Sequence, residues 1–115
     1  MLSRLMGVST ILPKDLSALI ERHAVTVIDV NARPHWLDVH VPGALTLDHA
    51  NYQRSDLPAN LEAPIVFYCS GPLCRKAPLA ARRAKGFGYT DVRVMSAGIS
   101  GWMAARLPTE SGDRR

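Results

Sequence analysis

The chain has 115 residues, a formal net charge of +4 at pH 7 and a hydrophobic content of 47%. This length suits one domain with a single core, and the composition is that of a folded protein. The charge is mild and aromatic residues are few, which argues against a nucleic-acid-binding protein. No stretch approaches the ~20 apolar residues of a membrane helix, so we expect no membrane partner.

The cysteine content and the N-terminal segment indicate in which cellular compartment the protein is expected. The chain has two cysteines, and its first residues lack the continuous apolar region and cleavage site of a secretory signal. Two cysteines without such a signal favour a reducing compartment and thiol chemistry rather than a disulfide framework. We therefore expect a cytoplasmic protein.

The N-terminal half alternates between helix and strand patterns. Pro13 suits the first turn of a helix in which Leu16, Leu19 and Ile20 share one face. The β-branched run that begins at Val25 is typical of a strand buried on both faces. The expected elements are a helix over 13–23, a strand over 25–30, a short helix around 36–37, and a short strand over 44–47 after a Pro-Gly turn.

The C-terminal half continues this alternation after a polar segment, 48–63, that we expect to be a connecting loop. The expected elements are a buried strand over 65–68, a helix over 75–85, a strand over 91–95, and a short helix over 98–107. Strands and helices in alternation predict an α/β fold with a parallel sheet between helices. The pattern gives one domain over 1–108 and a frayed tail over 109–115.

The segment PIVFYCSGPLCRKAP places Cys69 directly after a buried strand and shortly before a helix that begins near Arg75. In open parallel sheets the ligand crevice lies beyond the carboxyl ends of the strands. A loop that closes onto a helix start gathers amides without intrahelical acceptors, and these donors favour an anion. Gly71 gives the loop conformational freedom, and Arg75 and Lys76 add positive charge. The loop is therefore predicted to bind an anion and to favour a nucleophilic Cys69 thiolate.

The role of Cys74, five residues after Cys69, has two interpretations. Cys74 could be a resolving thiol that closes a disulfide or polysulfide with Cys69, provided that the Cα atoms come within ~7 Å. Alternatively its side chain packs inward, which is the favoured interpretation. For Cys69 itself, an inert buried cysteine at a strand end is the less favoured hypothesis, because the glycine and the cations all suit an active thiolate.

Four segments, in order, resemble the rhodanese (thiosulfate sulfurtransferase) family over residues 8–108. They are VTVIDV, HVPGAL, IVFYCSG and GYTDVRVMSAGISGWMAARLP. The resemblance implies a three-layer α/β domain with a central five-stranded, mostly parallel sheet flanked by helices. It also implies a sulfurtransferase in which Cys69 takes a sulfane sulfur from thiosulfate or a similar small anionic donor. Cys69 would carry this sulfur as a persulfide and pass it to a thiol or to cyanide.

The resemblance further assigns the anion-binding loop. It implies substrate-binding residues at Ser70, Gly71, Pro72, Leu73, Cys74 and Arg75. Arg75 is the best candidate for direct substrate contact. No cofactor and no metal are expected, and a sulfur-carrier or redox protein is a further compatible partner.

The sequence departs from the family pattern at three places. Asn31 stands where the family has Arg, and Ala97-Gly98 stands for Gly-Gly. The Cys-x5-Arg loop is one residue longer than in ordinary sulfurtransferases, as in related phosphatases and arsenate reductases, which usually have His where this chain has Tyr68. The Cys-x-Gly-Pro-x-Cys-Arg pattern of the loop also resembles a known subtype within the rhodanese-like group. Two alternatives therefore stay open. One is phosphatase or arsenate-reductase chemistry in the same loop, and the other is a non-catalytic module that senses redox state or binds partners.

Other polar residues are expected to have structural roles. Asp29, at a strand end, most simply orients a backbone turn. His40, just before a Pro-Gly turn, most simply holds the loop through hydrogen bonds. The remaining histidines have no spacing that resembles a metal site.

Overall fold

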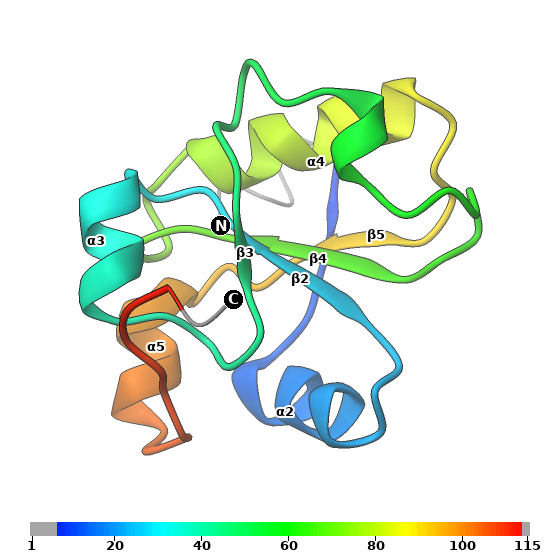
Figure 1. Cartoon of the computed structure of the whole chain (residues 1–115). Helices are drawn as coiled ribbons and strands as arrows, with labels where there is room; N and C mark the ends of the chain where they lie inside the picture. Colours follow the sequence, from blue (N-terminus) through cyan, green and yellow to red (C-terminus); the bar gives the residue numbers. More distant parts are fainter. Residues whose placement is uncertain (1–6, 114–115) are drawn as a thin grey trace.

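The structure is a computed structural model that describes residues 7–113. Five strands form one sheet, with helices on both of its faces (Figure 1). The strands are β1 (Ser9–Thr10), β2 (Thr26–Asp29), β3 (Leu45–Thr46), β4 (Ile65–Tyr68) and β5 (Val92–Val94). Their order is β1-β5-β4-β2-β3, and every neighbouring pair is parallel. The predicted α/β fold with a central five-stranded sheet is confirmed.

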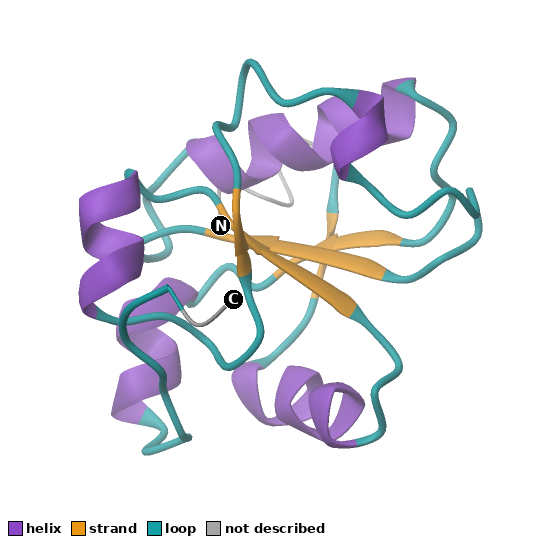
Figure 2. Ribbon diagram, viewed as in Figure 1, coloured by secondary structure: helices purple, strands orange, loops and turns teal. Residues whose placement is uncertain are grey.

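The helices cover the sheet in two layers (Figure 2). They are α2 (Pro13–Glu21), α3 (Arg33–Asp38), α4 (Lys76–Gly86), α5 (Gly98–Ala104) and the short 3₁₀ helix η1 (Arg54–Asp56). Helix α4 lies over one face, and α2 and α5 lie over the other (Figure 1). No helix among the described residues is long and apolar enough to cross a membrane.

Strand β4 separates two hydrophobic clusters and contributes to both. All four of its residues are buried. Ile65 and Phe67 belong to the cluster under α4, and Val66 and Tyr68 belong to the cluster under α2 and α5. Successive side chains of a strand point to opposite faces, so only a continuous apolar run can fill both clusters. This strand carries Cys69 at its carboxyl end.

The expected helices and strands all form, with small differences at their ends. Helix α5 ends three residues before the predicted boundary, because Arg106 adopts a left-handed φ of 59° that no α-helix can continue. Strand β1 was not predicted and pairs with β5. The segment 48–63 contains η1 and is anchored by Tyr52, whose hydroxyl donates to the Ala80 carbonyl at 2.7 Å.

Residues 109–113, which the sequence predicted to be part of a frayed tail, make specific contacts with the rest of the domain. Glu110 and His40 exchange backbone hydrogen bonds of 2.9 and 2.8 Å, and the Gly112 amide donates to the Leu37 carbonyl at 2.7 Å. Asp113 forms an ion pair of 3.0 Å with Arg33. The residues that make each contact lie far apart in the sequence, so the local composition of the tail did not indicate these contacts. Residues 114–115 lie outside the described part of the chain.

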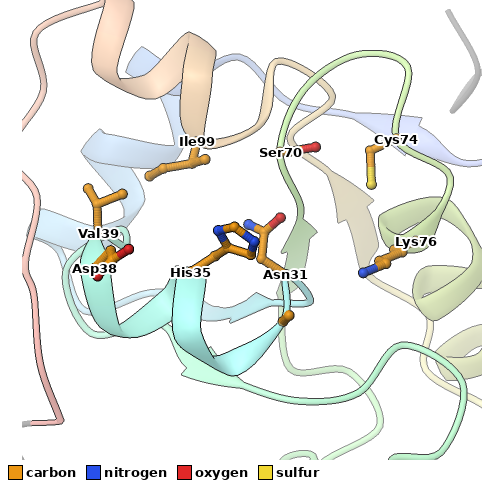
Figure 3. Close-up of a pocket in the computed structure, with 9 residues that line it drawn as sticks. Asn31, His35, Asp38, Val39, Ser70, Cys74, Lys76 and Ile99 are labelled. Carbon is orange, nitrogen blue, oxygen red and sulfur yellow. The ribbon is translucent and has the colours of Figure 1, made fainter.

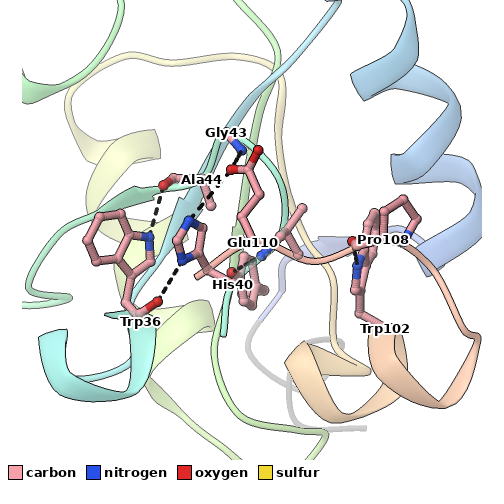
Figure 4. Close-up of polar contacts among 9 residues, drawn as sticks. Trp36, His40, Gly43, Ala44, Trp102, Pro108 and Glu110 are labelled. Atoms are coloured by element: carbon pink, nitrogen blue, oxygen red, sulfur yellow. Dashed lines mark hydrogen bonds and ion pairs between the residues drawn. The ribbon is translucent and has the colours of Figure 1, made fainter. Parts of the chain in front are cut away.

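His40 has the structural role that the sequence predicted. It is buried, stacks on Trp36 and donates from Nδ1 to the Trp36 carbonyl at 2.6 Å (Figure 4). Its Nε2 lies 3.7 Å from a Glu110 carboxylate oxygen that also accepts the Gly43 amide at 3.0 Å. The tail and His40 together fix the turn that precedes β3.

Candidate functional site

Cys69 lies in the middle of the carboxyl edge of the sheet. It follows β4, which pairs with β2 on one side and β5 on the other. Its side chain is buried, with 2% of its surface exposed. This is the position at which an open parallel sheet binds ligands.

The start of helix α5 holds the first residues of the cysteine loop. The Ile99 amide donates to the Cys69 carbonyl at 2.9 Å, and the Ser100 amide donates to the Ser70 carbonyl at 3.1 Å. The first amides of a helix have no acceptor within it, so the loop carbonyls satisfy them. The backbone of the loop is therefore fixed from the side of α5.

Gly98 makes this close approach possible. Its φ is +66°, and a Cβ at this position would lie 2.5 Å from the Gly71 amide nitrogen and 2.5 Å from the Ser70 carbonyl carbon. Ala97, which replaces the first glycine of the family pair, has an ordinary φ of −62°. Only the second glycine of the pair is therefore required in this chain.

Cys69 and Cys74 form a disulfide in the structure, and their Cα atoms are 6.4 Å apart. The Cys74 amide donates to the Gly71 carbonyl at 3.2 Å, which turns the loop back toward Cys69. Cys74 is half-buried and also packs against the core cluster under α4. The favoured interpretation of Cys74 as a packing residue alone was thus incomplete. The bond closes a short loop and joins no distant elements, so it is no disulfide framework.

Several amides of the loop have no backbone acceptor. Among the described residues, the backbone amides of Ser70, Gly71, Leu73 and Arg75 donate no hydrogen bond to another backbone group. Helix α4 begins at the next residue, Lys76, and brings the positive end of its dipole to the same place. Free amides at a helix start are donors for an anion.

A cavity of about 390 Å³ lies beside Cys74 (Figure 3). Residues from three parts of the chain line it: Asn31, Ala32, His35, Asp38, Val39, Ser70, Cys74, Lys76 and Ile99. Of the predicted site residues, Ser70 and Cys74 line this cavity. Cys69, Gly71, Pro72 and Arg75 are not among the lining residues, and Leu73 is 85% exposed at the tip of the loop.

Lys76 is a cation that lines the cavity, and the assignment of Arg75 to substrate contact stays a prediction. Arg75 is exposed and only caps α4, and Lys76 is the first residue of the helix. Lys76 also borders a second cavity of about 400 Å³, which Arg33 and His49 line as well. The exact start of a helix sets which of two neighbouring side chains faces a site, and sequence patterns locate such starts poorly.

Asn31 and His35 also line the cavity and were not predicted as site residues. Asn31 follows β2, the neighbour of β4 in the sheet, and His35 belongs to α3. The position of Asn31 just beyond a predicted strand was the one available signal, because parallel strands end at a common edge. No comparable sequence signal pointed to His35.

Asp29 holds Asn31 in place, as expected for a carboxylate that orients a turn. The backbone amide of Asn31 donates to Oδ1 of Asp29 at 2.7 Å. Asp29 is fully buried, and its Oδ2 has no hydrogen-bond partner among the described residues. Burial raises the pKa of Asp29, and contacts with Tyr68 and Asn31 only partly oppose it. Tyr68 is itself buried in the cluster under α2 and α5, where its hydroxyl accepts the Val41 amide at 3.0 Å.

The raised pKa of Asp29 gives stability a defined pH dependence. The folded protein keeps the Asp29 proton to higher pH than the unfolded chain, in which the pKa is near the ordinary 3.8. The folded state therefore loses stability as pH rises above this value and through the folded pKa. Asp29→Asn keeps an acceptor for the Asn31 amide and removes the titration. We expect Asp29→Asn to gain stability relative to wild type as pH rises from 4 to 7, measured by urea unfolding.

Asp48 provides a control of opposite sign. Hydrogen bonds, first that from the Ala50 amide, lower the pKa of Asp48, whose side chain is exposed. The ionised Asp48 side chain stabilises the folded state, and this contribution to stability is lost as pH falls. Asp48→Asn lacks the contribution, so it should become less stable than wild type as pH rises. If the difference in unfolding free energy between Asp29→Asn and wild type stayed constant from pH 4 to 7, the raised pKa of the buried Asp29 carboxyl group would be contradicted.

Comparison with known proteins identifies the family of this fold and loop. Residues 12–105 match the family model of the Rhodanese-like domain. The chain belongs to this family. The family resemblance found in the sequence is thereby confirmed. Among residues 7–113, no group of three or more His, Cys, Asp or Glu side chains is placed to hold a metal ion.

Solved structures that resemble this chain carry different functional descriptions. Thiosulfate sulfurtransferase from Pseudomonas aeruginosa superimposes with a TM-score of 0.77 and 26% identity, over 91% of this chain and 20% of that protein. A possible tyrosine phosphatase from Rhodopseudomonas palustris superimposes with a TM-score of 0.71 and 26% identity, over 90% of this chain and 86% of that one. Membership of the family is consistent with a transferase but does not by itself establish which reaction this chain catalyses.

A curated relative places a similar segment in a larger protein. The HTH-type transcriptional regulator Rv0324 of Mycobacterium tuberculosis is 34% identical over 94 residues, which are 80% of this chain. The match covers 40% of the regulator. The chain thus spans about two fifths of the length of this curated relative.

Proposed function

We propose that this rhodanese-like chain is a sulfurtransferase that carries a sulfane sulfur on Cys69. The observation that carries the proposal is the position of Cys69, at the end of the central strand and at the start of a loop in which four amides have no backbone acceptor. Such a site stabilises both a thiolate and an anionic substrate. The structural similarity to a thiosulfate sulfurtransferase supports the same reaction class.

The first half-reaction requires the Cys69–Cys74 disulfide to be reduced. The Cys69 thiolate attacks the outer sulfur of thiosulfate or of a similar small anionic donor. The S–S bond of the donor breaks, sulfite leaves with the bonding electron pair, and Cys69 holds a persulfide. The free loop amides and Lys76 stabilise the negative charge on the donor and on the departing sulfite. A reducing compartment, the cytoplasm, suits a site that works through a thiolate.

The second half-reaction returns Cys69 to the thiolate. A thiol or cyanide attacks the outer sulfur of the persulfide, takes that sulfur, and leaves the Cys69 thiolate behind. The cavity of about 390 Å³ beside the loop offers room for a small acceptor. A sulfur-carrier or redox protein could present its thiol at the same opening, next to the exposed Leu73.

A turnover assay separates sulfur transfer from the other reactions of this loop type. With thiosulfate and cyanide, the reduced protein should form thiocyanate, and reciprocal plots at several cyanide concentrations should be parallel, as for a double displacement. The same preparation should not hydrolyse p-nitrophenyl phosphate or reduce arsenate. Hydrolysis or arsenate reduction without thiocyanate would replace the proposed reaction with phosphatase or reductase chemistry.

Lys76, rather than Arg75, is expected to contribute to donor binding. Lys76→Gln should raise the KM for thiosulfate about fivefold with little change in kcat, the effect of losing one solvent-exposed ionic contact of ~1 kcal/mol. Arg75→Gln removes the same charge one residue earlier, outside the cavity. Steady-state kinetics at low ionic strength would measure both. Equal increases in KM would show that general electrostatic attraction, and not the cavity, recognises the donor.

A second candidate function is redox or persulfide sensing by the same two cysteines. The disulfide in the structure favours it, because the loop accommodates an oxidised state without losing the fold. The related segment in a protein named as a transcriptional regulator points in the same direction. A sensor would change its thiol state once per signal, so sustained thiocyanate formation distinguishes the enzyme from the sensor.

A further inference from the structure

We propose that Cys74 is a catalytic residue that resolves the Cys69 persulfide and releases hydrosulfide. In this step the Cys74 thiolate attacks Sγ of Cys69 and closes the disulfide that the structure contains. The outer sulfur leaves as hydrosulfide. The proposal rests on the sulfur-transfer function above and adds a second nucleophile and a second product.

The closed loop brings the two reacting sulfur atoms together. The inner sulfur of a Cys69 persulfide is Sγ of Cys69 itself, the atom to which Cys74 is bonded in the structure. The Cα separation of 6.4 Å is within the usual range for a disulfide. The turn from Gly71 to Cys74 and the hydrogen bonds from α5 hold this loop backbone. Cys74 can therefore reach the persulfide as a neighbour within one short loop.

The surroundings of Cys74 suit its role as the attacking thiolate. Its sulfur atom points into the cavity, and the Lys76 side chain projects into the same cavity (Figure 3). A nearby cation favours a thiolate over a thiol. The same opening to solvent gives hydrosulfide a way out.

The atoms and electrons of the sequence balance. Thiosulfate first gives its outer sulfur to Cys69 and leaves as sulfite. The Cys74 sulfur then forms a bond to Sγ of Cys69 while the bond to the outer sulfur breaks. The two cysteine thiols lose two electrons in total, and the sulfane sulfur gains two electrons and becomes hydrosulfide. The proton from the Cys74 thiol is released to solvent or to the hydrosulfide.

Whenever Cys74 closes the disulfide before an acceptor takes the sulfur, an external dithiol must reopen the loop before another turnover. Cys69 is 2% exposed and Cys74 is half-buried at the cavity, so the dithiol attacks Sγ of Cys74. Cys69 is then the leaving thiolate, at the position where the free loop amides stabilise it. The second thiol of the reductant displaces Cys74 and becomes oxidised. The net reaction converts the donor and a dithiol to sulfite, hydrosulfide and a disulfide.

A single-turnover experiment without any acceptor tests this proposal. Wild type, Cys74→Ser and Cys74→Ala are reduced with dithiothreitol, desalted under anaerobic conditions and mixed with one equivalent of thiosulfate. Wild type should release about one equivalent each of sulfite and hydrosulfide and lose two hydrogen atoms in intact mass. Both variants should release the sulfite, release no hydrosulfide and gain one sulfur atom. Because two different substitutions are tested, a folding defect in one variant does not decide the result.

The outcomes distinguish this proposal from the function on which it rests. A wild-type protein that keeps the added sulfur and releases no hydrosulfide would overturn the role of Cys74 and leave the Cys69 persulfide intact. Hydrosulfide from the Cys74 variants at the wild-type rate would overturn it equally. No sulfite and no sulfur gain in any of the three proteins would overturn both proposals.

Discussion

Replacing Gly98 by alanine is expected to destabilise the protein by about 3 kcal/mol, since the change combines backbone strain with a steric clash. The added Cβ would lie 2.5 Å from the backbone of Ser70 and Gly71, and the φ of +66° is unfavourable for alanine. The loop must move, and a misplaced catalytic group costs on the order of a hundredfold in rate. Urea unfolding and sulfur uptake from thiosulfate measure the two effects.

Gly43 supplies a matched control for Gly98. It also has a positive φ, +77°, but no atom lies within 4 Å of the Cβ that an alanine would add. Gly43→Ala therefore keeps the backbone strain, ~1–2 kcal/mol, and leaves the cysteine loop untouched. It should lose stability and retain wild-type sulfur uptake. Normal uptake by Gly98→Ala would show that the start of α5 does not position the loop.

Replacing Cys69 by serine is expected to reduce thiocyanate formation at least about a thousandfold, the scale of losing a catalytic nucleophile. A serine hydroxyl is not ionised near neutral pH and cannot hold a persulfide. The buried site and the loop hydrogen bonds are otherwise preserved, because the backbone carbonyl of residue 69 still accepts the Ile99 amide. The measurement is turnover of thiosulfate and cyanide by the reduced protein.

Cys74→Ser is the control for the structural part of this change. It loses the same disulfide as Cys69→Ser, so unfolding of the two oxidised variants should show similar losses of stability relative to oxidised wild type. Cys74→Ser still has the Cys69 thiol and should take up sulfur. Appreciable thiocyanate formation by Cys69→Ser would mean that another group carries the sulfur.

The sequence was sufficient to predict the central part of the fold. The continuous apolar run of β4 indicated burial on both faces, and the structure divides these residues between two core clusters. Helix α4 presents a face of small residues, Ala77, Ala80, Ala81 and Ala84, to the sheet. Because Cys69 follows a central strand, its position at the carboxyl edge of the sheet could also be predicted.

The features that the sequence did not predict depend on distant contacts. Strand β1 has two polar residues and becomes a strand only through its pairing with β5. Glu110 lies in a polar tail and is ordered by its bridge to His40. Lys76 and His35 face the cavity because of a helix start and a helix placement that local patterns do not set. Such contacts override local propensity.

The departures from the family pattern have different structural consequences. Ala97 is harmless because its backbone is helical, whereas Gly98 could not be replaced in the same way. Asn31, which stands in the place of an arginine, leaves Asp29 buried without a cationic partner at that position and places an amide side chain at the cavity. The pair of cysteines in a longer loop is the departure that bears most directly on chemistry.

The central claim, that Cys69 carries the transferred sulfur, is tested most directly by peptide mass mapping of Cys74→Ser. The reduced variant is incubated with thiosulfate under anaerobic conditions, thiols are blocked by alkylation, and the protein is digested. The proposed function predicts one additional sulfur atom on the peptide that contains Cys69, removable by dithiothreitol. A Cys69 peptide without added sulfur, in a protein that remains folded, would contradict it.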